Sequence, residues 1–544
     1  MMPGSGANFR VAGLSPIAGL QAGSALRRLA LAAMAGAIAA CGFQPLALWP
    51  LTLAGVAGLI ALVAQARGPA VAMACGWAWG VGHFTLGNNW IATAFTFQSK
   101  MPSALGGIAV FLLALYLALF PAAATLAGWL IGRRRPLALV LALAGSWIVA
   151  EWLRGWVFTG FPWNPLAAAA LGTFARPGLA ALVLPWAGTY AMSGLVVLLA
   201  GCWWLAAMGG RRKAVRLALA ILPPVLIGCT GLWQPAAQPG RVAMTLVQPN
   251  IEQTAIDDPG RFGEQFARLA GLSVPQGPGH RLVLWPESGA PDYLRDGYPR
   301  EWYGYATYMA DPAAARARIA RAIGPDSLLL TGTVDLVLAG DQATGGRNVI
   351  TALDGQGRIV GSYAKAHLVP YGEYLPLREF LEPLGLARLV PGAIDFLPGP
   401  GPRTTDLGPL GRMGGQICYE IVFSGAVAER ANRPDYIFNP TNDGWFGSWG
   451  PPQHLAQARM RAIEEGLPVL RSTTNGISAV IDARGVVRGS IARGVAGRVD
   501  MAVPSARAPT LFAKVGNPLG LIWAVALLAL SLLPSLNDWR RRRT

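Results

Sequence analysis

The sequence has little charge for its length. Only 13% of its 544 residues are charged, while 53% are hydrophobic, and this composition excludes an ordinary soluble enzyme. Several apolar runs reach the roughly 20 residues that are needed to cross the core of a bilayer. The chain is therefore predicted to be a membrane protein that also carries a water-soluble part.

Acidic residues are almost absent outside residues 235–510. That stretch has 26 Lys and Arg against 26 Asp and Glu, whereas the rest of the chain has 19 basic and only 2 acidic residues. The net charge of +17 thus comes entirely from the apolar part. Because the excess follows the membrane segments and forms no basic patch on a soluble domain, we expect no nucleic acid partner.

Eight apolar segments are long enough to be membrane helices. Seven lie in the bundle expected over residues 26–233, and the eighth lies in residues 511–544, which end in a basic cytoplasmic tail. A cleaved signal peptide is the competing interpretation of the first run, but that run continues into further spans. The predicted spans are 26–43, 46–65, 69–87, 104–131, 136–153, 184–207, 214–233 and 517–536.

Basic residues are unevenly distributed over the loops between these spans. If residues 1–25 are a cytoplasmic tail, fifteen Lys and Arg residues lie in the cytoplasm and four lie outside: Lys100, Arg154, Arg176 and Lys514. This asymmetry follows the positive-inside rule. It puts residues 234–510 on the external side of the membrane.

Residues 234–510 alternate between strand and helix patterns. Such interleaving indicates a layered α/β domain, and about 270 residues are enough for it to build its own core. The expected helices are 259–272, 311–323 and 452–466. The expected strands are 241–248, 281–287, 327–336, a hairpin at 346–363, the strand that leads to Cys418, 434–439, 467–472 and 476–482.

Cysteine and lysine are scarce in this domain. Cys418 is its only cysteine, and Lys365 is its only lysine beside 25 arginines. Each has an ordinary explanation, since free Cys is often a buried core residue and a lone Lys is often a surface residue. However, an ammonium group is not interchangeable with a guanidinium at a tight site, and it can stabilise a thiolate or an oxyanion.

Glu287 ends the apolar run 282–286, where a strand of an α/β domain delivers active-site groups. The alternative is a carboxylate that only caps the following turn. As a base, Glu287 would form an activated-thiol arrangement with Lys365 as the cation and Cys418 as the nucleophile.

Histidines give weaker candidates. The domain's three histidines, His280, His367 and His454, lack the spacing of metal ligands, so we expect no metal. His367 is the weaker alternative as a partner for Cys418, and no Gly-x-Ser-x-Gly motif competes for the nucleophile role.

Several motifs together resemble the nitrilase superfamily. Trp285-Pro286-Glu287, Lys365 within Lys-x-His-Leu-Val-Pro-x-Gly-Glu-Tyr, and Cys418-Tyr419-Glu420 look like its Glu-Lys-Cys triad. Segments 439–447 and 471–476 agree with it, and with the membrane spans the chain resembles the bacterial apolipoprotein N-acyltransferases. The resemblance implies a multi-span α-helical membrane bundle of about eight helices plus an α/β nitrilase-like α-β-β-α sandwich domain.

The resemblance also implies an activity, namely acyl transfer through a thioester. Glu287 would be the general base, Lys365 the oxyanion stabiliser and Cys418 the nucleophile. The donor would be the sn-1 acyl chain of a membrane phospholipid, and the acceptor the α-amine of a diacylglyceryl apolipoprotein. It further implies no cofactor, a monomer, and a bacterial inner membrane location with the catalytic domain in the periplasm.

Further residues come with less specific expectations. Ile256-Asp257 stands where many members of the family have Lys-Trp. Glu151 and Arg154 could pair on one helix face or mark a functional site at the membrane boundary. The expected supporting residues are Glu373, Tyr419 and Glu420; the loop residues Trp445, Phe446 and Trp449 could contact acyl chains or simply fill a core.

Two other classes of protein compete with this interpretation. A membrane-anchored amidase or nitrilase-like hydrolase would use the same triad, with water in place of an amine. A transporter or a binding protein would need no nucleophile, but intramembrane charges are too sparse for an ion pathway.

Overall fold

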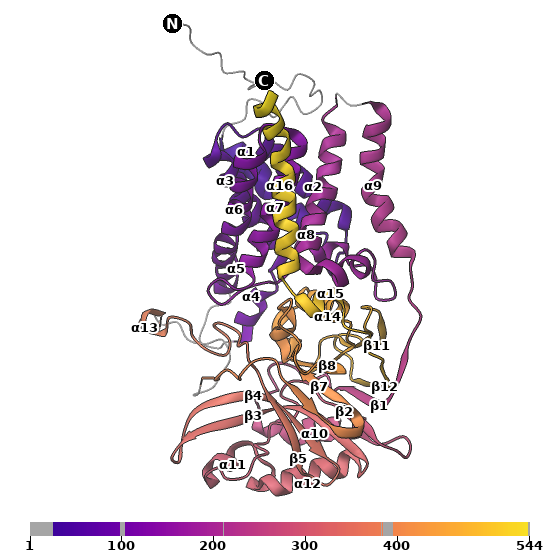
Figure 1. Ribbon diagram of the computed structural model, residues 1–544. Helices are drawn as coiled ribbons and strands as arrows, with labels where there is room; N and C mark the ends of the chain where they lie inside the picture. Colours follow the sequence, from indigo (N-terminus) through magenta and orange to yellow (C-terminus); the bar gives the residue numbers. More distant parts are fainter. Residues whose placement is uncertain (1–24, 98–103, 210–211, 382, 384–394, 542–544) are drawn as a thin grey trace.

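The computed structural model of the protein describes residues 25–97, 104–209, 212–381, 383 and 395–541. Residues 1–24 of the expected cytoplasmic tail lie outside the described residues, as do Lys100 and the last three residues. The described chain has two parts (Figure 1): a helical bundle, and a sandwich of two sheets below it. The C-terminal helix α16 (Pro518–Arg541) runs from the sandwich side of the bundle to the opposite end.

The bundle consists of ten helices in the described residues. Seven of the eight predicted spans each correspond to one of these helices. The remaining span, 104–131, corresponds to two consecutive helices. By length and hydropathy, four helical stretches of the described chain can cross a membrane: Ala104–Gly132, Pro136–Arg154, Ala180–Ala207 and Lys213–Leu232. The helices are α1 (Ala25–Ala40), α2 (Trp49–Ala64), α3 (Pro69–Gly87), α4 (Ile91–Ala94), α5 (Ala104–Leu117), α6 (Leu119–Gly132), α7 (Pro136–Arg154), α8 (Ala180–Ala207), α9 (Lys213–Leu232) and α16 (Pro518–Arg541).

Small residues let the bundle helices approach closely. A Cβ atom added at Gly36 of α1 would lie 1.9 Å from the backbone oxygen of Trp79 on α3, and one at Gly82 of α3 would lie 1.9 Å from that of Ala33. Close backbone contact of this kind is typical of membrane helices, where packing replaces the hydrophobic effect as the driving force.

The sandwich consists of two six-stranded sheets. The first sheet has the order β12-β1-β2-β3-β4-β5, and the second sheet has the order β11-β10-β9-β8-β7-β6. The strands are β1 (Pro239–Gln248), β2 (Arg281–Leu284), β3 (Ser327–Ala339), β4 (Gln342–Asp354), β5 (Ile359–Ala364), β6 (Thr404–Asp406), β7 (Arg412–Gly415), β8 (Tyr436–Thr441), β9 (Val469–Thr473), β10 (Ser478–Ile481), β11 (Val487–Ile491) and β12 (Gly497–Pro504).

Helices cover the outer face of each sheet, which confirms the expected α-β-β-α layers. Leu282 and Leu284 of β2 point into the core between the sheets, while Val283 packs against the outer helices α10 and α12. Burial on both faces explains the continuous apolar run. On the second sheet, α14 lies over Ile437 and Val469. The helices of this part are α10 (Phe262–Ser273), α11 (Arg300–Ala306), α12 (Pro312–Ile323), α13 (Arg378–Leu381), α14 (Gly450–Glu465) and α15 (Leu511–Val515).

One bundle helix is broken near its start. Pro185 lies inside α8, and Gly188 has non-helical dihedrals, φ 77° and ψ 176°, a region that only glycine adopts without strain. A Cβ atom at Gly188 would also lie 2.2 Å from the ring of Phe512, which precedes α16. Glycine at this position therefore permits both the break and the contact with the C-terminal segment.

Replacing Gly188 by alanine should destabilise the protein by about 1–3 kcal/mol, the cost of a strained backbone conformation. The measurement is the thermal midpoint of the purified protein in detergent. Gly228→Ala in α9 is the matched control, because nothing lies within 4 Å of its added Cβ and alanine favours a helix by about 0.5–1 kcal/mol. Equal midpoints for the two variants would contradict the assigned role of Gly188.

Candidate active site

The three predicted catalytic side chains each follow the end of a strand. Glu287 comes three residues after β2 and Lys365 directly after β5, both in the first sheet. Cys418 comes three residues after β7 of the second sheet. Residues that lie in different parts of the sequence thus meet between the two sheets.

Lys365 is a buried cation between two carboxylates. Its side chain is 1% exposed, and its Nζ atom lies 2.9 Å from Glu373 Oε1 and 3.6 Å from Glu287 Oε1. Burial lowers the pKa of Lys365, but the charges of Glu373 and Glu287 outweigh this and raise it above its usual value. The ammonium group is therefore charged at any physiological pH.

Asn348 of β4 joins the two carboxylates. Its Nδ2 group donates to Glu287 Oε1 at 2.7 Å and to Glu373 Oε1 at 3.1 Å, while its backbone carbonyl oxygen accepts from the backbone N–H of Lys365 at 2.8 Å. Glu287 Oε2 accepts from the backbone N–H of Asn442 at 2.8 Å. Each carboxylate is thus fixed by donors as well as by the ammonium group.

Cys418 begins a short 3-10 helix, η8 (Cys418–Val422), with φ 51°. A positive φ is uncommon for a residue other than glycine and marks a sharp turn at this position. The carbonyl oxygen of Cys418 accepts from His454 Nε2 at 3.1 Å and from Asn439 Nδ2 at 3.4 Å. The turn that presents the thiol is therefore held from two other segments.

The proton of His454 can be assigned from its neighbours. Burial and the charge of Arg471 lower the pKa of His454 to about 4, so the ring is neutral near pH 7. Since the Cys418 carbonyl can only accept, Nε2 carries a proton, while Nδ1 lies 3.0 Å from Arg471 Nη2 and 3.1 Å from Asp443 Oδ1. His454 thus orients the Cys418 backbone and does not abstract the thiol proton.

The resting thiol is protonated. Burial, together with the negative charge of Glu287, raises the pKa of Cys418 well above its ordinary value, although Lys365 and the N–H of Asn442 act in the opposite direction. Cys418 as a whole is only 5% exposed. Forming a thiolate therefore requires a local base. Among the carboxylates, Glu287 has the largest effect on the pKa of Cys418.

Glu420 connects the turn of Cys418 to the segment of Lys365. Its Oε1 atom accepts from Tyr363 Oη at 2.9 Å and from the N–H groups of Ala366 and His367 at 2.7 and 3.1 Å. Its Oε2 atom accepts from Ile417 N at 2.7 Å. One side chain therefore holds the strand ends of both sheets in register.

Tyr419 links the same turn to the bundle. Its hydroxyl group donates to the Gly160 carbonyl at 3.2 Å, and its ring is stacked on Trp163 with centroids 6.5 Å apart. His367, the alternative partner of the thiol, instead contacts the Thr159 carbonyl through Nε2 at 2.9 Å. Both residues thus face the loop that follows α7.

The three aromatic loop residues lie where the sandwich meets the bundle. The ring of Phe446 lies 4.7 Å from that of Trp90 and 5.7 Å from that of Trp163, and Trp445 lies 5.7 Å from Phe97. Trp449 packs beside the same cluster. The loop therefore fills a core, as one alternative expected, but this core includes membrane-bundle residues.

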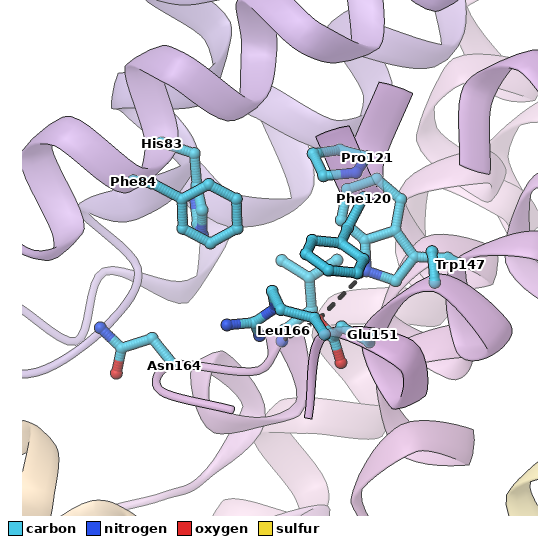
Figure 2. Close-up of a pocket in the computed structure, with 10 residues that line it drawn as sticks. His83, Phe84, Phe120, Pro121, Trp147, Glu151, Asn164 and Leu166 are labelled. Atoms are coloured by element: carbon cyan, nitrogen blue, oxygen red, sulfur yellow. Dashed lines mark hydrogen bonds between the residues drawn. The ribbon is translucent and has the colours of Figure 1, made fainter. Parts of the chain in front are cut away.

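Glu151 and Arg154 bind the loop 155–166 in addition to their shared electrostatic interaction. Glu151 Oε1 accepts from Leu166 N at 2.9 Å, and Arg154 Nη1 donates to the carbonyls of Phe161 and Trp163 at 2.7 and 2.8 Å. Figure 2 shows Glu151 beside Trp147 at a small cavity, with His83 across from them. The cavity holds about 10 Å³, the space of roughly one water molecule, which is too small for an acyl chain.

Asn348 and His454 are the two residues of this arrangement that sequence reasoning did not assign to it. Asn348 stands directly before the buried Val349 and Ile350, so a polar amide beside an apolar run was the signal that could have marked it as a site residue.

Among the residues that the structure describes, no group of three or more His, Cys, Asp and Glu side chains could hold a metal ion. Ile256 packs with Ile251 and Ala255 in a small apolar cluster.

Comparisons with known proteins match both parts of the chain. Residues 35–202 match the apolipoprotein N-acyltransferase N-terminal domain, and residues 244–499 match the carbon-nitrogen hydrolase family. The apolipoprotein N-acyltransferase of Rhodopseudomonas palustris is 34% identical over 93% of this chain and 95% of its own length. That of Bradyrhizobium diazoefficiens is 35% identical over 93% and 94%. An amidase of the nitrilase superfamily from Nesterenkonia AN1 is 18% identical, covers 50% of this chain and 92% of its own, and has a TM-score of 0.33.

The two charges beside Cys418 should move its reactivity in opposite directions. Glu287→Gln removes the charge that raises the thiol pKa, so alkylation by iodoacetamide should begin at a lower pH than in the unmodified protein. Lys365→Met removes the charge that lowers the thiol pKa, so alkylation should begin at a higher pH. The readout is mass spectrometry of the Cys418 peptide across a pH series.

The exposed Cys229 provides the internal control for these measurements, because its alkylation profile should be the same in all three proteins. Shifts of Cys418 in the same direction for both variants would show that the two charges do not act on the thiol as described.

Proposed function

The chain belongs to the apolipoprotein N-acyltransferase family, and we propose that it transfers an sn-1 acyl chain from a glycerophospholipid to a diacylglyceryl apolipoprotein. The acceptor is the free α-amino group of the S-diacylglyceryl cysteine. The observation that carries the proposal is the buried Lys365 between Glu287 and Glu373, next to a protonated thiol, in a sandwich joined to a membrane bundle.

In the first step, Glu287 takes the proton of Cys418 and the sulfur attacks the carbonyl carbon of the sn-1 ester. The carbonyl oxygen becomes an oxyanion, which Lys365 stabilises. When this intermediate collapses, the ester C–O bond breaks, and Glu287 returns the proton to the leaving lysophospholipid. The acyl chain remains as a thioester on Cys418.

In the second step, the free amine of the apolipoprotein attacks the thioester carbonyl. Glu287 takes a proton from the attacking nitrogen, Lys365 again stabilises the oxyanion, and the C–S bond breaks as the amide forms. The departing sulfur receives the proton from Glu287, which restores the resting thiol. Atoms and charges balance without a cofactor.

Glu373, Tyr419 and Glu420 support these steps without touching the reacting atoms. Glu373 holds Lys365, Glu420 holds the two strand ends together, and Tyr419 ties the nucleophile turn to the bundle. The aromatic loop around Trp445, Phe446 and Trp449 lies between the site and the bundle, so we propose that acyl chains pass along it.

The charge distribution supports the proposed location. Fifteen basic residues on one side of the predicted spans and four on the other favour a periplasmic sandwich in a bacterial inner membrane. The acyl donor would then come from the outer leaflet of that membrane.

The test is incubation of the purified protein with acyl-labelled phospholipid, with and without a diacylglyceryl peptide. We expect label that survives denaturation, is released by hydroxylamine, and passes to the peptide amine. Cys418→Ala should take up no label, and Lys365→Met should label on the order of 100- to 1000-fold more slowly, as expected for the loss of an oxyanion donor.

Two other results would assign a different function. Release of the label to water, with none on the peptide, would identify a hydrolase. Full labelling of Cys418→Ala would refute the thioester.

A further inference from the structure

The second part of α8 begins like a new helix inside the bundle. Because Pro185 has no N–H group and Gly188 is not helical, the regular hydrogen-bond ladder restarts at Thr189. The backbone N–H of Thr189 therefore needs an acceptor from outside the helix. Nineteen residues, 189–207, follow in this second part.

The acceptor comes from the sandwich. Glu464 of α14 accepts with Oε1 from Thr189 N at 2.7 Å and from Thr189 Oγ1 at 2.6 Å. Glu464 is fully buried, and Arg461 Nε lies 3.0 Å from its Oε2 atom. A carboxylate at a helix N-terminus is favoured both as a cap and by the helix dipole.

The same carboxylate also binds the segment that carries the nucleophile. Ser424 Oγ donates to Glu464 at 2.9 Å, two residues after η8 ends, and Arg461 Nη1 contacts the Val422 carbonyl at 3.4 Å. At the other end of α14, His454 holds the carbonyl of Cys418. The short segment from Cys418 to Ser424 is therefore held at both ends by one helix.

α14 itself is embedded on both sides. Leu455, Ala458 and Ala462 pack on the second sheet, whereas Ala456, Met460 and Ile463 belong to the core of the bundle. Apolar packing thus holds this helix from two sides, whereas an apolar side chain at position 464 would leave the buried N–H of Thr189 without its acceptor. A charge at position 464 is better explained by the geometry that it imposes on its partners.

We propose that Glu464 is a positioning residue that sets the register between the broken membrane helix α8 and the Cys418 turn. This rests on the proposed function, because the register matters for a lipid that lies against the bundle while its ester reaches the thiol. An acyl donor that needs no bundle contact does not depend on this register.

The experiment compares two acyl donors on the full-length protein in detergent. One donor is the labelled phospholipid, and the other is a small activated ester, p-nitrophenyl acetate. With Glu464→Gln, acylation of Cys418 by the phospholipid should slow on the order of ten- to a hundredfold, since a misplacement of about 1 Å can cost 100-fold. The rate with the small ester should stay within about twofold of the unmodified protein.

Thr189 provides the second half of the test through a double-mutant cycle. Thr189→Val should give the same selective loss, Thr189→Ser should retain most of the phospholipid rate, and Thr189→Val with Glu464→Gln should lose no more than either single change. Glu264→Gln, in the exposed Arg261–Glu264 pair of the same spacing, is the matched control and should change neither rate.

Three results would overturn the positioning role: an unchanged phospholipid rate in Glu464→Gln, an equal loss with both donors, or additive losses in the cycle. Failure of the unmodified protein to accept label from phospholipid, while it reacts with the small ester, would instead count against the proposed function.

Discussion

The site depends on a single ammonium group that is buried between two carboxylates. Taking a charge out of water is costly unless close partners replace the water, and here Glu373 and Glu287 do so at 2.9 and 3.6 Å. Burial, together with the negative charges of Glu287 and Asp443, outweighs the effect of Lys365 and raises the pKa of Cys418. The thiol is therefore kept neutral at rest, beside a lysine whose own pKa is raised by the two carboxylates.

This electrostatic arrangement requires the two sheets to meet in a fixed register. Lys365 and Glu287 follow strands of the first sheet, while Cys418 follows a strand of the second sheet. The packed residues between the sheets set their distance, and the four hydrogen bonds to Glu420 fix their lateral position. Burial raises the pKa of Glu420 to about 7, against the lowering effect of these donors.

Much of the fold could be predicted from local sequence signals. Apolar length predicted the bundle helices except α4, and it did not separate α5 from α6. The candidates Glu287, Lys365 and Cys418 came from short motifs and from the scarcity of lysine and cysteine in the domain. The strands β11 and β12 were missed because most of their residues are only partly buried and form no continuous apolar run. The contacts of Asn348 and His454 were missed because they join residues 61 and 36 positions apart, which no periodicity reports.

The aromatic loop and α14 show why the bundle and the sandwich act as one body. Phe446 belongs to a cluster that contains Trp90 of the bundle, and nearly every residue of α14 is buried, on one side by a sheet and on the other by membrane helices. The sequence of α14 has apolar residues on two faces, but this pattern does not predict which face packs on the sheet and which packs on the bundle. Since the turn of Cys418 is held by that same helix, α14 links the packing of the bundle to the position of the thiol.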